Sequence, residues 1–200
     1  MIDLHFNTTL NVDPLIMPIE ELSTDFWNLI PVNLIKTDLL DFFFSKGIKI
    51  SKISSFYEEY PNCYNPNGGT ITNGGIHSDC LGIGDMSKLI WMWGDDHKIA
   101  WYLPKSNMPL DYNYAINDRT PSNSIRNYTT FTLEQMDEIY STKIEFPSLI
   151  QVGVPHAVVT LSGKRRSLSM VLEDLNNNFI TMNNAKLILK DYLVDSDNIK

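Results

Sequence analysis

Alternation of apolar and polar residues with a period of two runs through most of the chain. It is clearest over residues 49–60, 89–93, 99–103, 146–160 and 165–172. This spacing predicts strands that bury one face. Many short strands of this kind favour a mainly β fold, built as a sandwich or a jelly-roll barrel.

A wider apolar stripe over residues 26–44 predicts a mainly helical region, interrupted near Pro31 and ended by Gly47 as a C-cap. We expect this region to cover one face of the barrel. A short extended piece over residues 2–6 precedes it, and residues 185–193 form a terminal helix or strand.

Residues 104–130 are polar, rich in Pro and Asn, and without a clear period. Long loops of this kind in a compact domain are often functional, so we expect the segment to hang over the open end of the barrel and contact substrate. Its expected contact residues are Tyr112, Tyr114, Arg119 and Arg126. Residues 131–140 are either a short helix or an irregular strand entry, and the capping box that Thr132 and Gln135 fit favours the short helix.

Composition limits the classes of function. A length of 200 residues predicts one domain, and a formal charge of −8 argues against general binding of nucleic acid backbones. Two cysteines, without CxxC spacing or a secretory signal, suggest a reducing cytoplasm. No apolar run is long enough to cross a bilayer, so we expect no membrane contact.

The candidate chemistry begins with His77 and Asp79, which follow an Asn-Gly-Gly turn. Residues two apart on a strand point to the same face, so both side chains should enter one cavity. An H-x-D tripeptide alone is a weak signal, and most examples bind no metal. A second histidine farther along the chain strengthens it.

That histidine is His156, within the predicted strand over residues 146–160. It shares a face with Ile150, Val152, Val154 and Val158. A buried histidine is often an ordinary core residue, but both of its ring nitrogens need partners, and a metal would supply one. Two histidines and one carboxylate form the facial triad of ferrous enzymes, which leaves coordination positions open.

Two arginines follow the turn at residues 161–164. Arg166 alternates with Leu168, Met170 and Leu172, whereas Arg165 alternates with Ser167. The apolar set predicts that Arg166 faces the cavity and Arg165 faces solvent. A buried guanidinium requires an anion, and its planar fork suits a carboxylate.

The order H-x-D, a distant His and an Arg ten residues later resembles the iron(II)- and 2-oxoglutarate-dependent oxygenases. The sequence Val154-Pro155-His156-Ala157-Val158 and the run from Leu161 to Ser169 resemble the small prolyl-hydroxylase-like and aspartyl/asparaginyl-hydroxylase-like members, which are frequent in bacteria and phages. The resemblance covers roughly residues 70 to 172. It implies a double-stranded β-helix, a jelly-roll or cupin-like barrel. Residues 1–70 would give helical and strand support, residues 71–172 the metal-binding barrel core, and residues 173–200 a C-terminal extension.

Residue by residue, the resemblance implies that His77, Asp79 and His156 bind Fe(II) and that Arg166 holds the distal carboxylate of 2-oxoglutarate. Some members carry R-x-S at this point, which would instead select Arg165 with Ser167. Tyr102 is a candidate second partner for that carboxylate, or a core aromatic residue.

The implied activity is a dioxygenase that hydroxylates a C–H bond of a protein side chain or small molecule, using O₂ and releasing succinate and CO₂. The expected location is the cytoplasm, or the host cytoplasm if a phage encodes the protein. Two alternatives stay open: a non-catalytic jelly-roll module with aromatic strands around Trp91, Trp93 and Trp101, or a metal-dependent cupin enzyme that does not use 2-oxoglutarate.

Overall fold

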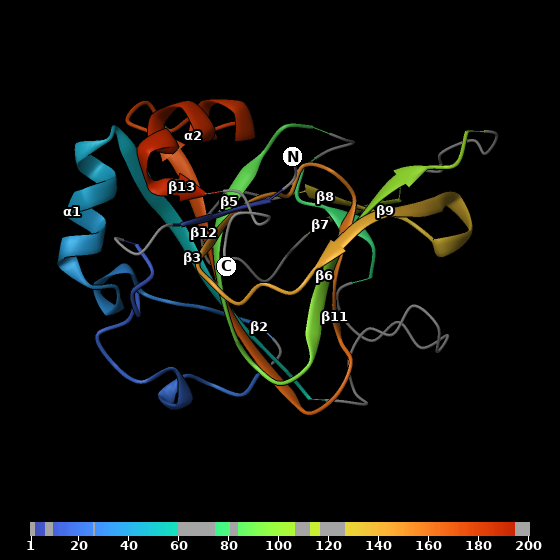
Figure 1. Cartoon of the computed structure of the whole chain (residues 1–200), viewed down its shortest axis with the longest axis horizontal. Helices are drawn as coiled ribbons and strands as arrows, with labels where there is room; N and C mark the ends of the chain where they lie inside the picture. The colour runs from blue at the N-terminus through green and yellow to red at the C-terminus, as the bar shows by residue number, and fades with distance from the viewer. Residues whose placement is uncertain are drawn as a thin grey trace.

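Two antiparallel sheets face each other in the computed structural model (Figure 1). The structure describes residues 3–6, 10–25, 27–59, 75–80, 84–106, 113–116 and 127–194. The larger sheet contains, in spatial order, β13 (Leu193–Val194), β1 (Asp3–Phe6), β10 (Ser148–Gln151), β5 (Ser87–Gly94), β12 (Lys164–Asp174), β3 (Ile48–Glu59) and β2 (Trp27–Leu29). The smaller sheet contains β7 (Asn113–Ile116), β8 (Asn127–Thr130), β4 (His77–Ser78), β11 (His156–Thr160), β6 (His97–Pro104) and β9 (Met136–Thr142).

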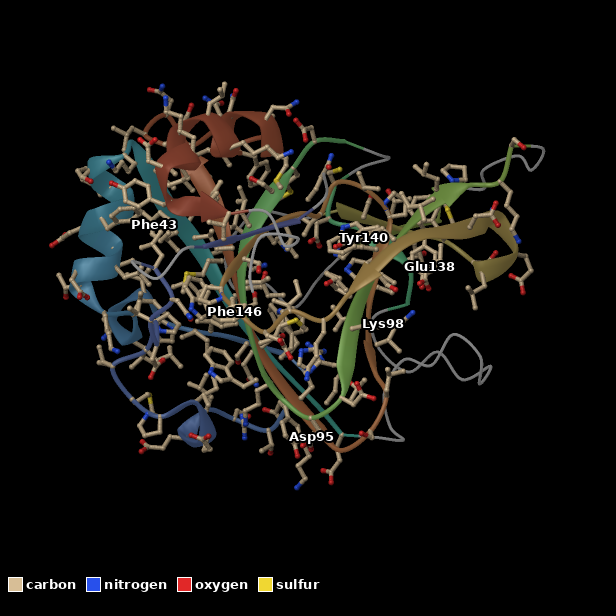
Figure 2. The ribbon with its side chains drawn as sticks, viewed as in Figure 1. Phe43, Asp95, Lys98, Glu138, Tyr140 and Phe146 are labelled. Carbon is tan, nitrogen blue, oxygen red and sulfur yellow. The ribbon has the colours of Figure 1, made fainter. Side chains whose placement is uncertain are left out.

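Helices cover the outer face of the larger sheet. They are α1 (Thr37–Ser45) and α2 (Met182–Leu189), with short 3-10 turns at Ile19–Glu21, Val32–Leu34 and Lys190–Tyr192 (Figure 1). Phe43 of α1, labelled in Figure 2, is almost fully buried against this sheet. The mainly β fold with helical support is therefore confirmed. None of the helices in the described residues has the length and hydropathy to span a membrane.

Three apolar clusters define the layers. The largest joins the helices to the outer face of the larger sheet through residues such as Leu168 and Met170. The second lies between the sheets and includes Ile90, Ile99 and Trp101. The third covers the outer face of the smaller sheet with the chain around Phe131. Because both faces of both sheets carry buried residues, alternation alone cannot say which face of a strand points between the sheets.

The predicted strand over residues 146–160 is two strands. β10 ends at Gln151 in the larger sheet and β11 begins at His156 in the smaller one, so the chain crosses between the sheets over residues 152–155. The apolar residues predicted to share a face nevertheless meet in the inter-sheet cluster. The common environment was predicted correctly, and the continuous strand was wrong.

Other elements needed similar corrections. The helical prediction over residues 26–44 holds only from Thr37, because β2 and a 3-10 turn precede it. The helix expected over 131–140 is a 3-10 turn, Leu133–Gln135, whose capping box is present, followed by β9. The segment 104–130, expected to lack regular structure, contains β7 and β8. The predicted C-cap Gly47 does adopt a left-handed φ of 74°.

At one end of the sandwich, the turn that follows β5 contacts the start of β12. Asp95, labelled in Figure 2, follows β5, and its backbone N–H donates to Lys164 O at 2.9 Å. Gly94 has φ of 116°, and a Cβ there would lie 2.0 Å from Lys164 O. Only glycine allows this approach. The β5–β6 and β11–β12 turns thus close the end of the sandwich opposite His156.

Candidate metal centre

His77 and His156 lie directly opposite each other in the smaller sheet. They are paired residues of β4 and β11, and their ring centroids are 4.5 Å apart. His156 also pairs with Trp101 of β6, which belongs to the inter-sheet cluster. Side chains of paired residues share a face, so both imidazoles point between the sheets.

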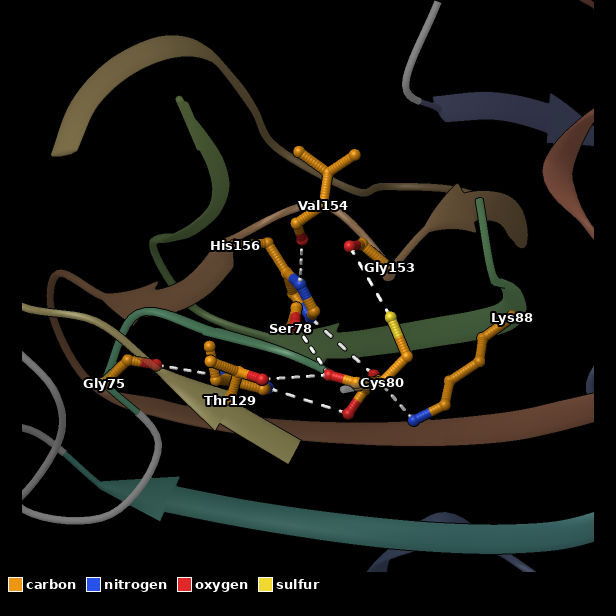
Figure 3. A network of polar contacts seen from close by, with 10 residues as sticks. Gly75, Ser78, Cys80, Lys88, Thr129, Gly153, Val154 and His156 are labelled. Carbon is orange, nitrogen blue, oxygen red and sulfur yellow. Dashed lines mark hydrogen bonds and ion pairs between the residues drawn. The ribbon is translucent and has the colours of Figure 1, made fainter. Parts of the chain in front are cut away.

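Asp79 completes the cluster from just beyond β4. Its Oδ1 lies 3.9 Å from His77 Nε2, and its Oδ2 lies 3.9 Å from His156 Nε2. Its backbone N–H donates to Val152 O at 2.9 Å, in the crossing segment that leads to His156. Thr129 Oγ1 and Ser78 Oγ both donate to Cys80 O, which fixes the other side of the short segment (Figure 3). The predicted convergence of the three residues is therefore present.

Backbone contacts orient both imidazoles. His77 Nδ1 lies 2.7 Å from Gly75 O, and His156 Nδ1 lies 2.9 Å from Val154 O (Figure 3). A carbonyl only accepts, so each Nδ1 carries a proton, and the Nε2 atom of each ring faces Asp79. Hydrogen bonds of this kind hold the ring orientation and tautomer of metal-binding histidines.

The charge states also suit ligation. Burial lowers the pKa of His156 to about 3, and the neighbouring His77 acts in the same direction. Burial alone would raise the pKa of Asp79, but Lys88, His77 and His156 together outweigh it and hold that pKa well below its usual range. At neutral pH the site therefore offers a carboxylate and a neutral imidazole on His156.

The three donor atoms lie within 4.8 Å of one another and could hold a metal ion. Two donors on adjacent positions of an ion bound at about 2.1 Å are about 3 Å apart. The observed 3.9 Å separations therefore require only a small inward shift of the side chains. A donor set of two imidazoles and one carboxylate fits iron(II) and other divalent transition ions.

Lys88 is a fourth member of the cluster, and sequence reasoning missed it. Its side chain extends into the polar network shown in Figure 3. Its Nζ lies 2.7 Å from Asp79 Oδ2, and the side chain is 15% exposed. It belongs to β5 of the larger sheet and shares the inward face with Ile90 and Met92. That period of two was a usable signal, but the predicted strand began one residue later, at Leu89.

Arg166 does not point toward the triad, so the face predicted for it is wrong. Its Nη1 donates to the carbonyl oxygens of Leu22 and Ser23, and its guanidinium lies over the Tyr57 ring. The apolar residues that alternate with it pack beneath the helices. They mark the outer face of the sheet.

Arg165, predicted to face solvent, is buried between the sheets. Its Nη2 lies 2.7 Å from Glu58 Oε2, and the two side chains are 3% and 4% exposed. Its Nη1 donates to Ser167 Oγ at 2.8 Å, and Thr160 Oγ1 donates to Glu58 Oε2 at 3.0 Å. The Arg165 and Ser167 pair of the R-x-S alternative therefore lies between the sheets, and Glu58 already neutralises its arginine.

The remaining candidates lie elsewhere. Tyr102 belongs to the cluster on the outer face of the smaller sheet, away from the triad. Tyr112, Arg119 and Arg126 fall outside the described residues, and only the backbone of Tyr114 is described, in β7. His97 is a further histidine, buried in β6 opposite Thr160.

No family model, no curated protein and no solved structure matches this chain. The site therefore stands on its own geometry.

Proposed function

We propose that the protein is an Fe(II)- and 2-oxoglutarate-dependent dioxygenase that hydroxylates a C–H bond of a protein side chain or small molecule. The observation that carries the proposal is the meeting of His77, Asp79 and His156 on one inward face, with both Nε2 atoms turned toward the carboxylate. Three ligands on one side of an ion leave positions open for a chelating cosubstrate and O₂.

The strand order supports a double-stranded β-helix. From β3 to β6 the chain alternates between the sheets, and it does so again from β9 to β12. This winding brings β3, β12, β5 and β10 together in one sheet and β4, β11, β6 and β9 together in the other. The triad lies on β4 and β11 with the segment after β4, and the buried arginine lies on β12, the order that the resemblance implies.

The chain's own residues would hold and orient the reactants. When bound, iron and 2-oxoglutarate supply the oxidation of a C–H bond by O₂, with succinate and CO₂ as coproducts. His77, Asp79 and His156 would fix the ion, and Gly75 O and Val154 O would keep the imidazoles in place. The inter-sheet apolar cluster, which contains Trp101, would exclude water.

Arg165 and Ser167 are the better candidates for the distal carboxylate. The Nη1 of Arg165 donates along β12 to Ser167. Ser167 pairs with Met92 of β5 and is therefore nearer to Lys88 along the sheet than Arg165, which pairs with Gly94. Glu58 occupies the Nη2 and Nε side of the guanidinium. A second carboxylate could therefore bind only the Nη1 side, with less net positive charge than an unpaired arginine offers.

For the alternative of a non-catalytic binding module, Trp91 and Trp101 give little support to the stacking of a carbohydrate on the aromatic strands. Trp91 is 4% exposed and Trp101 is fully buried, and their ring N–H groups donate to Val12 O and Gln151 O. A metal-dependent cupin enzyme without 2-oxoglutarate is favoured by one observation, the neutralisation of Arg165 by Glu58.

Anaerobic titration with Fe(II) and then 2-oxoglutarate tests the proposal. A weak visible charge-transfer band should develop in the wild type and be lost in His77→Ala, Asp79→Ala and His156→Ala. His97→Asn is the matched control, since His97 is a buried histidine outside the triad. A band that survives Asp79→Ala, or Fe(II) binding without any response to 2-oxoglutarate, would contradict the proposal.

A further inference from the structure

Lys88 places a positive charge beside the triad that the proposed reaction does not yet use. It comes from β5 of the larger sheet, whereas His77 and His156 come from β4 and β11 of the smaller sheet. Its neighbours across the sheet are Ile150 and Val171, both in the apolar inter-sheet cluster. The ammonium group is held 2.7 Å from Asp79 Oδ2.

Metal binding would change the charge balance around Lys88. Without a metal, the carboxylate of Asp79 balances the ammonium of Lys88. A divalent ion adds two positive charges to this balanced pair, among side chains that are at most 23% exposed. Excess charge away from water is costly unless it is paired. The loaded site therefore requires an anion, and a dicarboxylate supplies the two negative charges.

Distance identifies which end of such an anion Lys88 can reach. An ion bound to Asp79 Oδ2 at about 2.1 Å would be no farther than about 5 Å from Nζ, because Nζ lies 2.7 Å from the same oxygen. A carboxylate oxygen bound to that ion lies within a short side-chain movement of Nζ. An ammonium has three donors, so it can contact Asp79 and a second carboxylate together.

We propose that Lys88 binds the metal-proximal carboxylate of the cosubstrate once the triad is loaded. Lys88 would thereby act as a positioning residue that turns an Asp79 ion pair into part of an anion site. The inference rests on the proposed function for the identity of the anion. Its geometric basis is independent, since the Asp79–Lys88 contact belongs to the described structure.

The test measures metal and anion binding separately in the full chain. Mn(II) is titrated by calorimetry into the wild type and Lys88→Met, and oxalate and 2-oxoglutarate are then titrated into each Mn(II)-loaded protein. Oxalate carries only a chelating end, so it isolates the carboxylate next to the metal. Lys98→Met is the matched control, because Lys98 pairs with Glu138 on the smaller sheet (Figure 2).

Lys88→Met should bind Mn(II) as tightly as the wild type or up to about fivefold more tightly, since the ion pair that competes for Asp79 is gone. Its affinity for oxalate and 2-oxoglutarate should fall by about 10- to 100-fold, the range for a lost hydrogen bond to a charged group. Lys98→Met should change neither. A merely structural lysine would weaken Mn(II) binding together with anion binding.

Unchanged oxalate affinity in Lys88→Met, or loss of Mn(II) binding in that variant, would overturn the inference. If the same protein still bound 2-oxoglutarate, the oxygenase proposal would stand. Lys88-dependent binding of oxalate without binding of 2-oxoglutarate would support the anion site and contradict the oxygenase proposal. Lys88→Gln provides a second neutral variant should the methionine variant fail to fold.

Discussion

Replacing Glu58 by glutamine should lower the free energy of unfolding far more than the loss of a charge at the surface does. The substitution keeps the shape of the side chain but removes the only charge within 2.7 Å of the Arg165 guanidinium among the described residues. Both side chains are at most 4% exposed, so water cannot compensate. Breaking a buried pair by neutralising one partner costs about 3–5 kcal/mol, and Thr160 Oγ1 also loses its charged acceptor.

The assay is urea unfolding at neutral pH with fitted midpoints and slopes. For slopes of about 2 kcal/mol/M, the midpoint of Glu58→Gln should fall by about 1.5–2.5 M. The double variant Glu58→Met with Arg165→Met removes both charges and should be clearly more stable than Glu58→Gln. Glu138→Gln breaks the exposed pair with Lys98 and should cost less than about 1 kcal/mol.

A midpoint of Glu58→Gln equal to that of Glu138→Gln would refute this reasoning, because it would mean that Arg165 has another counter-charge or access to water. The same variant also tests the distal carboxylate site. If 2-oxoglutarate binds Arg165, Mn(II) and 2-oxoglutarate together should stabilise Glu58→Gln more than they stabilise the wild type. Equal stabilisation would assign Arg165 to Glu58 alone.

Three further results are expected. Gly94→Ala should cost more than about 2 kcal/mol in urea unfolding, because its Cβ would meet Lys164 O at 2.0 Å. Gly47→Ala, with left-handed φ but nothing within 4 Å, should cost only about 1–2 kcal/mol; equal losses would contradict the clash. Burial lowers the pKa of His97 below 6.5, so the folded state binds fewer protons than the unfolded state below that pH. Stability should fall on acidification from pH 7.5 to 5, and less so in His97→Asn; parallel pH profiles would argue against this. Asp79→Ala should abolish Mn(II) binding by calorimetry while the protein remains folded, and retained binding would exclude the triad.

The meeting of His77, Asp79 and His156 was predictable because its signal is local and chemical. The spacing of His77 and Asp79 fixes their proximity through two residues of chain, and the pairing with His156 then needs only one strand contact. The predicted alternation around His156 also identified its apolar neighbours correctly, although the chain changes sheets between them. A site whose residues are close together in the sequence can thus be predicted correctly even when the strand boundaries are predicted wrongly.

The arginine face was not predictable by the same method. Alternation identifies a buried face only when the other face is solvated, but β12 is covered on both sides. Its larger apolar residues, Leu168 and Met170, pack beneath the helices, whereas Arg165, Ser167 and Ser169 share the other face. Choosing the more apolar set therefore selected the outside of the sandwich. Which set faces the triad depends on pairing with β5, and that contact joins residues about 75 positions apart.

The inward face of the larger sheet consequently carries two cationic side chains that are neutralised in different ways. The sequence of a single strand does not reveal this difference. At one end, Arg165 is compensated by Glu58 within the fold. At the other, Lys88 is compensated by Asp79, the residue that a metal would also bind. The first pair would keep its charge balance when an ion enters, and the second would lose it. The affinity for an anion that binds after the metal should therefore depend mainly on Lys88. Arg165 should contribute less to that affinity, because Glu58 already neutralises its charge.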